Sequence, residues 1–212
     1  MANLANGSTV FLASALAAAK NVTAATNAAE AVLTSTGHGL KDGDFVVVTN
    51  GWNDTNGRVF KVGASAADSF KLVGCDTSDT VRFPAGAGVG SVKKITEWTQ
   101  ISQITNVEAS GGEQQFTQYG FLEDDFERQL PSVKSARAIT FTMAYEPDLP
   151  GYKAAAKASD SKAQTPLRIN LPTGKTLLYN GYPSLNDTPA LTRNEIMTVS
   201  LSYSLSVKFN QY

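Results

Sequence analysis

The stretch Met-Thr-Val-Ser-Leu-Ser-Tyr-Ser-Leu-Ser-Val-Lys-Phe at residues 197–209 decides the fold class, because apolar and polar side chains alternate in it without a break. A period of two over thirteen residues indicates a β-strand with one face on a core and the other in water. At about 3.3 Å per residue such a strand would run roughly 40 Å, whereas an ordinary strand has about 5–6 residues. We therefore expect a long strand that serves an extended sheet, a barrel wall or an assembly.

The rest of the C-terminal half carries weaker signals of the same kind. Residues 136–145 alternate, and residues 166–171 place Leu167, Ile169 and Leu171 on one face. One helix is predicted over Pro150–Ser159, since proline is tolerated in a first turn and four alanines follow. The second half is thus predicted to be mainly β with one flanking helix.

The N-terminal half contains short β-like runs separated by Gly, Asp and Asn turn signals. Five such runs are spaced about twelve residues apart: residues 31–36, 45–49, 58–62, 69–73 and 91–95. About 70 residues of this kind suffice for a small barrel or sandwich. The composition changes at 93–96, from Ala, Gly, Ser and Thr to longer alternating runs, which suggests a domain boundary there.

Composition excludes several classes of function. The chain has 212 residues, one His (His38), one Cys (Cys75) and a net charge of −1. An internal disulfide is impossible, a Cys/His zinc site is nearly so, and triad catalysis would depend on one imidazole. Near neutrality also argues against tight binding of duplex DNA. We expect no enzyme, no cofactor and no metal.

Motifs for nucleotide or membrane binding are missing or incomplete. Gly174-Lys175-Thr176 lacks the upstream glycine of a phosphate-binding loop, and Leu171–Gly174 is typical of a turn between strands. The most apolar stretch, Thr9–Ala19, is shorter than the roughly 20 residues that span a bilayer. A secretory signal would begin with a positively charged region, but no Lys or Arg precedes this stretch. We expect no membrane insertion.

Two groups of residues leave other functions open. Glu123, Asp124, Asp125 and Glu127 are possible paired carboxylates for a metal or for a hydrolase of the glycosidase type, although a solvated or subunit-facing loop is the simpler interpretation. Trp52 and Trp98 are possible stacking platforms for a sugar or a nucleotide, as in a carbohydrate-binding or phage decoration module, although core and interface roles are simpler.

The first half resembles a small β-barrel module that recurs in phage structural proteins and in one domain of ubiquitin-activating enzymes. The residues that carry this resemblance are 33–40, 43–44, 56–62, 70–72 and 76–78. The module brings no known chemistry with it.

The remainder resembles the major tail tube protein of long, non-contractile-tailed bacteriophages of the siphovirus type. The residues that carry this resemblance are Trp98, Ile101 and Ile104, then 122–125, 134–136, 139–141, 145–151, 171–174, 179–182 and 194–199. It implies a β-sandwich with one flanking helix that assembles into hexameric rings, and the rings stack into a tube. The inner sheets of six subunits would form one barrel around a channel for ejection of the genome. The implied partners are further copies of the chain, the tape measure protein and duplex DNA passing through the lumen, and the tail terminator and tail tip proteins. The implied location is the virion, with assembly in the host cytoplasm.

The resemblance divides the chain into a discontinuous tail tube domain, residues 1–20 and 96–212, and an inserted small barrel, residues 21–95. We expect the insert to project outside the tube as a decoration. Segments 110–118 and 123–130 are expected to be loops that contact a neighbouring ring, with Glu123, Asp124, Asp125, Glu127 and Arg128 as the candidate contacts. A neutral or acidic lumen would suit a conduit, because a basic one would hold the phosphates.

Overall fold

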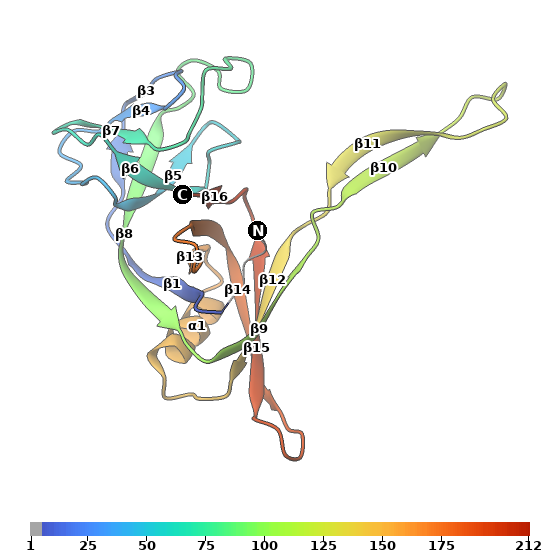
Figure 1. Cartoon of the computed structure of the whole chain (residues 1–212). Helices are drawn as coiled ribbons and strands as arrows, with labels where there is room; N and C mark the ends of the chain where they lie inside the picture. Colours follow the sequence, from blue (N-terminus) through green and yellow to red (C-terminus); the bar gives the residue numbers. More distant parts are fainter. Residues whose placement is uncertain (1–5) are drawn as a thin grey trace.

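The computed structural model describes residues 6–212, and nearly all of its strands belong to one antiparallel sheet. The sheet has 14 strands, and its main path runs β3-β4-β7-β6-β5-β8-β1-β13-β14-β15-β12-β9. A separate two-stranded sheet, β10-β11, extends away from the rest of the molecule (Figure 1). The fold class predicted from alternation is confirmed: the protein is mainly β, with one helix in the described part.

The elements of the first half are short apart from the first strand and the last. They are β1 (Thr9–Leu16), β2 (Lys20–Val22), β3 (Ala24–Ala25), β4 (Val32–Thr34), β5 (Phe45–Asn50), β6 (Val59–Gly63), β7 (Ser69–Leu72) and β8 (Gly90–Ile101). The five β-like runs predicted from the sequence correspond to β4 to β8.

The elements of the second half are longer. They are β9 (Ile104–Ser110), β10 (Gln114–Tyr119), β11 (Arg128–Lys134), β12 (Ala138–Ala144), α1 (Pro150–Ser161), β13 (Thr165–Asn170), β14 (Thr176–Ala190), β15 (Thr198–Leu205) and β16 (Asn210–Gln211). Helix α1 begins at the predicted proline and extends two residues beyond the predicted end.

The strands β8, β1, β13, β14, β15, β12 and β9 curl around one apolar core, and we call this part the body. Helix α1 packs on the inside of the curl, where Ala155 is fully buried. The alternation predicted for residues 136–145 and 197–205 places Phe141, Leu201 and Tyr203 in this core. The body is therefore built as the period of two predicts, within a single continuous sheet.

The prediction of one strand over 197–209 is wrong in its length. Strand β15 ends at Leu205, and residues 210–211 form β16, which pairs with the beginning of β14. The last contact in the register of β15 with β14 is made by Ser206, whose amide (3.2 Å) and hydroxyl (3.1 Å) both donate to the Asn180 carbonyl oxygen. The longest strands are instead β14 and β8, with 15 and 12 residues.

Strands β2 to β7 and the first half of β8 form a smaller unit. Strand β2 pairs with β8 while β3, which begins two residues after β2 ends, pairs with β4. The pairings β8-β5-β6-β7-β4-β3 therefore return to β2 and close a circuit. A second apolar core fills it, with Leu33, Val46, Phe60 and Phe70 almost completely buried. We call this unit the small barrel.

Strand β8 belongs to both parts, so the predicted boundary at residues 95/96 lies inside a strand. Its first half pairs with β2 and β5, and its second half pairs with β1. A third apolar cluster lies at this junction and combines Val59 and Ile95 with Ala13 and Leu178 of the body.

Candidate functional site: a polar sheet face and a projecting hairpin

The strands β14, β15, β12 and β9 share a polar face with a regular arrangement of side chains. Backbone register aligns their outward residues in rows across the four strands. The rows are Tyr182-Ser204-Ala138-Ser110, Ser184-Ser202-Thr140-Glu108 and Asn186-Ser200-Thr142-Asn106. The opposite side chains of the same strands face the core, as Leu201 and Phe141 do. Hydroxyl and amide groups therefore cover one side of this four-stranded section.

This face is almost free of charge. Among the twelve residues of the three rows, Glu108 is the only one that carries a charge, and it is negative. A surface without cations has no groups that neutralise phosphates, which is the main source of affinity for nucleic acids. The face can therefore lie beside DNA without retaining it.

The same section has unpaired backbone on both sides. Strand β9 ends the path of the sheet and pairs only with β12 among the described strands. On the other side, β13 pairs with β14 only as far as Gly181, which leaves residues 182–190 without a strand partner there. One amide of that stretch is satisfied by α1, because the Leu185 N–H donates to Ser159 Oγ at 3.1 Å. Open strand edges are templates for pairing with another chain.

The hairpin β10-β11 projects from the end of β9 (Figure 1). It leaves the body through Gly111 and Gly112, both with positive φ, and a Cβ on Gly111 would lie 1.8 Å from the Ala136 carbonyl oxygen. Ser135 fixes the root, because its hydroxyl accepts the Gly112 amide at 2.8 Å and donates to the Glu113 carboxylate at 2.7 Å.

Large apolar side chains cover the hairpin without a core to bury them. They are at least half exposed: Phe116, Phe121, Leu122, Phe126, Leu130 and Val133. A two-stranded hairpin is at best marginally stable in water, and exposed apolar patches mark interaction surfaces. The hairpin therefore has the composition of a surface that is covered in an assembly.

The five candidate contact residues lie together at the tip of this hairpin. Asp124 accepts a hydrogen bond from the Phe121 amide at 3.3 Å and forms an ion pair with Arg128 at 3.0 Å. The Arg128 guanidinium also lies over the rings of Phe121 and Phe126, at 5.7 and 5.3 Å. Glu123, Asp125 and Glu127 make no ion pair with any described residue. The expectation of a loop is wrong for most of 110–118, because Ser110 ends β9 and residues 114–118 belong to β10. It is confirmed for residues 123–127, which lie between β10 and β11, and only residues 128–130 of the second segment are in a strand.

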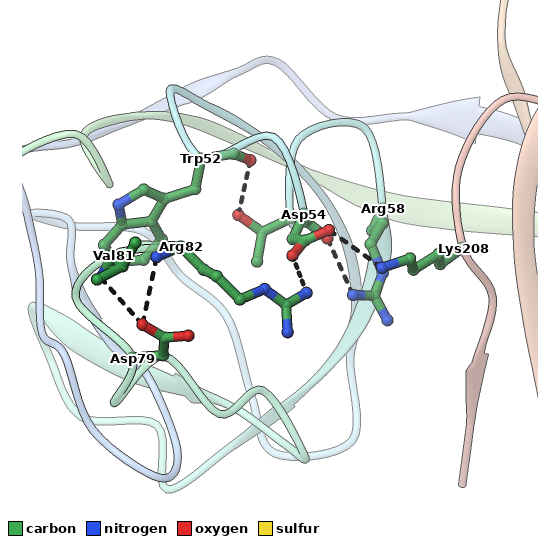
Figure 2. A network of polar contacts seen from close by, with 8 residues as sticks. Trp52, Asp54, Arg58, Asp79, Val81, Arg82 and Lys208 are labelled. Atoms are coloured by element: carbon green, nitrogen blue, oxygen red, sulfur yellow. Dashed lines mark hydrogen bonds and ion pairs between the residues drawn. The ribbon is translucent and has the colours of Figure 1, made fainter. Parts of the chain in front are cut away.

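The junction between the small barrel and the body is held by polar contacts as well as by the third apolar cluster. Asp54 is the central residue of one network, in which Arg82 and Lys208 both bind its carboxylate (Figure 2). Burial by itself raises the pKa of Asp54, but the hydrogen bonds from Lys208 and Arg82 outweigh it and hold that pKa below its ordinary value. Asp79 orders the loop that carries Arg82, because its carboxylate accepts the Val81 amide at 3.0 Å.

The last residues of the chain lie across the same junction. Asn210 donates to the Val59 carbonyl oxygen at 2.6 Å and accepts from Arg58. The Tyr212 hydroxyl accepts the Lys61 amide at 3.2 Å and donates to the Val73 carbonyl oxygen at 3.1 Å. The C-terminus thus connects β14 of the body with the small barrel.

The comparisons with known proteins give these surfaces a context. A sequence model described as phage tail tube protein, TTP, matches residues 50–212, which is most of the chain. The chain belongs to the phage tail tube protein family. It is therefore a structural protein of a phage tail, and this family is not an enzyme family. A search of the curated proteins finds no relative of this tail tube protein.

A comparison with solved structures gives matches of low identity and low TM-score to this tail tube protein. A chain of the virion of a native gene transfer agent particle is 12% identical, with a TM-score of 0.41 over 54% of this chain and 88% of that one. A chain from the tail of an empty gene transfer agent particle, computed with C6 symmetry, is also 12% identical. Its TM-score is 0.41 over 53% of this chain and 84% of that one. A chain from the tube-terminating cap of the anti-feeding prophage is 19% identical, with a TM-score of 0.37 over 53% of this chain and 81% of that one.

The residues that suggested other functions are structural in this tail tube protein. Trp52 is 1% exposed, packs edge-on against Phe83 and donates its Nε1 hydrogen to the Pro84 carbonyl oxygen at 2.9 Å, so it is not a sugar platform. His38 is buried against Phe70. Burial raises the pKa of Cys75 to about 11, so its thiol is protonated at neutral pH. Residues 6–212 contain no group of acidic, His or Cys side chains that could hold a metal.

Two further findings concern the predictions from sequence. No helix among the described residues is long and apolar enough to cross a membrane. Leu171–Gly174 forms the predicted turn between β13 and β14, with the Gly174 amide bonded to the Leu171 carbonyl oxygen at 3.0 Å. Residues 1–5, which begin the predicted tail tube domain, lie outside the described residues.

The open strand edges were missed, because alternation reports which face is buried and not which edge is paired.

Proposed function

We propose that six copies of this chain form a ring, and that the rings stack into the tail tube of a long, non-contractile tail through which DNA is ejected. One observation carries the proposal: the section β14-β15-β12-β9 combines a polar, cation-free face with open backbone on both sides. Family membership supplies the tail tube role, and the ring number of six is implied by the resemblance.

In this proposal the sheet continues from one copy to the next. Strand β9 of one copy lies beside residues 182–190 of its neighbour, and closure of the ring leaves no open edge. The polar rows then line the bore, and Val199, Leu201 and Tyr203 stay in each subunit core. Closed barrels place alternate side chains inside and outside in this way.

The remaining parts of the chain take positions away from the bore. Among the strands of the body, β8 and β9 are the two ends of the sheet, and the small barrel joins the body at β8. This arrangement supports a place for residues 21–95 on the outside of the tube as a decoration. The tip residues Glu123, Asp124, Asp125, Glu127 and Arg128 contact a neighbouring copy. The tape measure protein and DNA occupy the bore, and the tail terminator and tail tip proteins bind the two ends of the tube.

Assembly is tested first with the purified wild-type chain. Negative-stain microscopy should show tubes of uniform diameter, and averaged cross-sections should show six-fold symmetry. A chain that remains strictly monomeric at high concentration contradicts the proposal.

The orientation of the polar face is tested by adding charge to it. The variant Ser200→Lys/Ser202→Lys should still form tubes, because both side chains are polar and partly exposed in the single chain. Its tubes should retain short duplex DNA in a salt-dependent way, whereas wild-type tubes should not. The matched control Ser200→Asn/Ser202→Asn should behave like wild type. Lysine tubes that retain no more DNA than the asparagine tubes would place this face away from the bore.

A further inference from the structure

We infer that the acidic tip of the β10-β11 hairpin of one copy docks in a basic notch of a second copy, between the hairpin root and the small barrel. This inference rests on the proposed assembly and names the surface that receives the candidate contact residues. Three features carry it: the charge and shape of the notch, the composition of the tip, and the distance between them within one chain.

The notch lies where three parts of the chain meet. Its walls come from the hairpin root, from the loop before β6 in the small barrel, and from the segment after β15, and they enclose about 340 Å³. Four cationic side chains line it: Arg58, Lys134, Arg137 and Lys208. Asp54 is the single acidic residue of its lining, and this carboxylate already binds Lys208 and Arg82.

Two of these cations have no counterion in the single chain. Lys134 and Arg137 form no ion pair with any described residue. The lining also contains three apolar residues, Ala136, Leu205 and Val207, beside the uncharged polar Asn53, Ser135 and Ser206. The notch therefore combines apolar surface with unpaired cations, which fits an apolar side chain flanked by carboxylates.

The hairpin tip has this composition. Leu122 is completely exposed and Phe126 is 61% exposed, and both stand next to acidic residues. Glu123, Asp125 and Glu127 are free of ion pairs within the described chain, as the notch cations are. Complementary charges of this kind fix the register of an interface and favour one partner over others.

The tip cannot reach the notch of its own chain. The notch is at the root of the same hairpin, and β10 alone separates root from tip by six residues, or about 20 Å. The occupant is therefore a second copy. The contact is heterologous, because the two surfaces differ, and heterologous contacts generate rings or open helical arrays.

Charge exchange tests the pairing directly. Glu123→Lys/Asp125→Lys/Glu127→Lys reverses the tip and leaves the Asp124–Arg128 pair intact, and Lys134→Glu/Arg137→Glu reverses the notch. Each variant alone should lose tube formation at a concentration where the wild type assembles. The chain with both reversals should form tubes again. An equimolar mixture of the tip variant and the notch variant should also form tubes. In the mixture the basic tip of one variant meets the acidic notch of the other, and the unchanged acidic tip meets the unchanged basic notch.

The controls separate this inference from the proposed function. Lys41→Glu and Glu30→Lys reverse exposed charges of the small barrel away from both surfaces, and they should assemble like wild type. Thermal melting should show that every variant is folded. If the wild type forms tubes and the tip and notch variants form them equally well, the docking inference is wrong while the tube function stands. A wild-type chain without tubes contradicts the proposed function itself.

Cross-linking distinguishes tip-to-notch contact from tip-to-tip contact. Leu122→Cys/Ala136→Cys carries one thiol on each surface, while Cys75 is buried. A short bis-maleimide should convert assembled double-cysteine protein into a ladder that extends beyond the dimer. Each single-cysteine variant should give no ladder. Dimers from Leu122→Cys alone would show that two tips meet each other, and would overturn the inference.

Discussion

The junction and the hairpin are both places where the chain departs from the body, and they solve the same physical problem in opposite ways. At the junction, apolar side chains of the small barrel and the body are buried together, and the C-terminal residues satisfy backbone groups of β6. On the hairpin, side chains of the same kind stay in water, and the tip carboxylates other than Asp124 have no cationic partner among the described residues.

The difference separates contacts that stabilise the subunit from contacts left for a partner. Buried apolar area contributes to folding in the single chain, whereas exposed area contributes only when another surface covers it. The free energy of unfolding of the isolated subunit should therefore respond strongly to changes at the junction and weakly to the same changes on the hairpin.

The largest effect on unfolding is expected for Leu178→Ala in the junction. Leu178 is 1% exposed and packs in the cluster shared by the two parts. Removing a buried leucine side chain costs about 2–5 kcal/mol, because transfer energy is lost and a cavity remains. Urea denaturation of the subunit before assembly measures this loss in the free energy of unfolding. A loss below about 1 kcal/mol would mean that the junction contributes little to the fold.

The next effect is expected for Tyr212→Phe, which removes one hydroxyl at the end of the chain. The Lys61 amide and the Val73 carbonyl oxygen then lose their partner at a partly buried site, which costs about 1–3 kcal/mol. The matched control is Tyr119→Phe on the hairpin, whose hydroxyl has no hydrogen bond to any described residue. Equal denaturation midpoints for the two variants would contradict a C-terminus that holds the small barrel.

The same contrast explains what the sequence predicts well. Alternation located the strands whose faces divide core from water, as in β12 and β15, because side-chain burial imposes the period of two. The helix followed from Pro150 and the alanines after it. Both signals are local, and each depends on a core that the element itself lines.

The features that were missed depend on backbone partners. Alternation continues through Phe209, yet the strand ends at Leu205 and residues 210–211 pair with the beginning of β14, and no side-chain period encodes that change of partner. Strands β10 and β11 have no core and therefore no clear period, and Pro131 in β11 argues further against a strand prediction there. Of the candidate site, the acidic tip was found from composition, while the notch required segments far apart in sequence to be brought together.

A smaller effect at the junction is expected from acid. The pKa of Asp54 is lowered in the folded chain, so its ion pairs stabilise the fold above the ordinary carboxyl pKa and are lost as the pH falls through the lowered value. Its partners Arg82 and Lys208 are mostly exposed, which limits the contribution to about 0–1 kcal/mol. Denaturation at pH 7 and near pH 3 should show a smaller acid-induced loss for Asp54→Asn than for wild type. An identical loss in both would remove Asp54 from the contacts that hold the junction.

The smallest effect on the subunit is expected for Leu130→Ala, the same chemical change as Leu178→Ala but on the hairpin. Leu130 is 56% exposed, so the substitution removes little buried area, and the free energy of unfolding should change by at most about 0.5 kcal/mol. Assembly should respond in the opposite order if the proposed assembly covers this exposed leucine with a second copy. The critical concentration for tube formation should rise more for Leu130→Ala than for Leu178→Ala when both are folded at low temperature. A variant Leu130→Ala that unfolds as easily as Leu178→Ala would mean that the hairpin is part of the subunit fold, and the contrast between the two regions would fail.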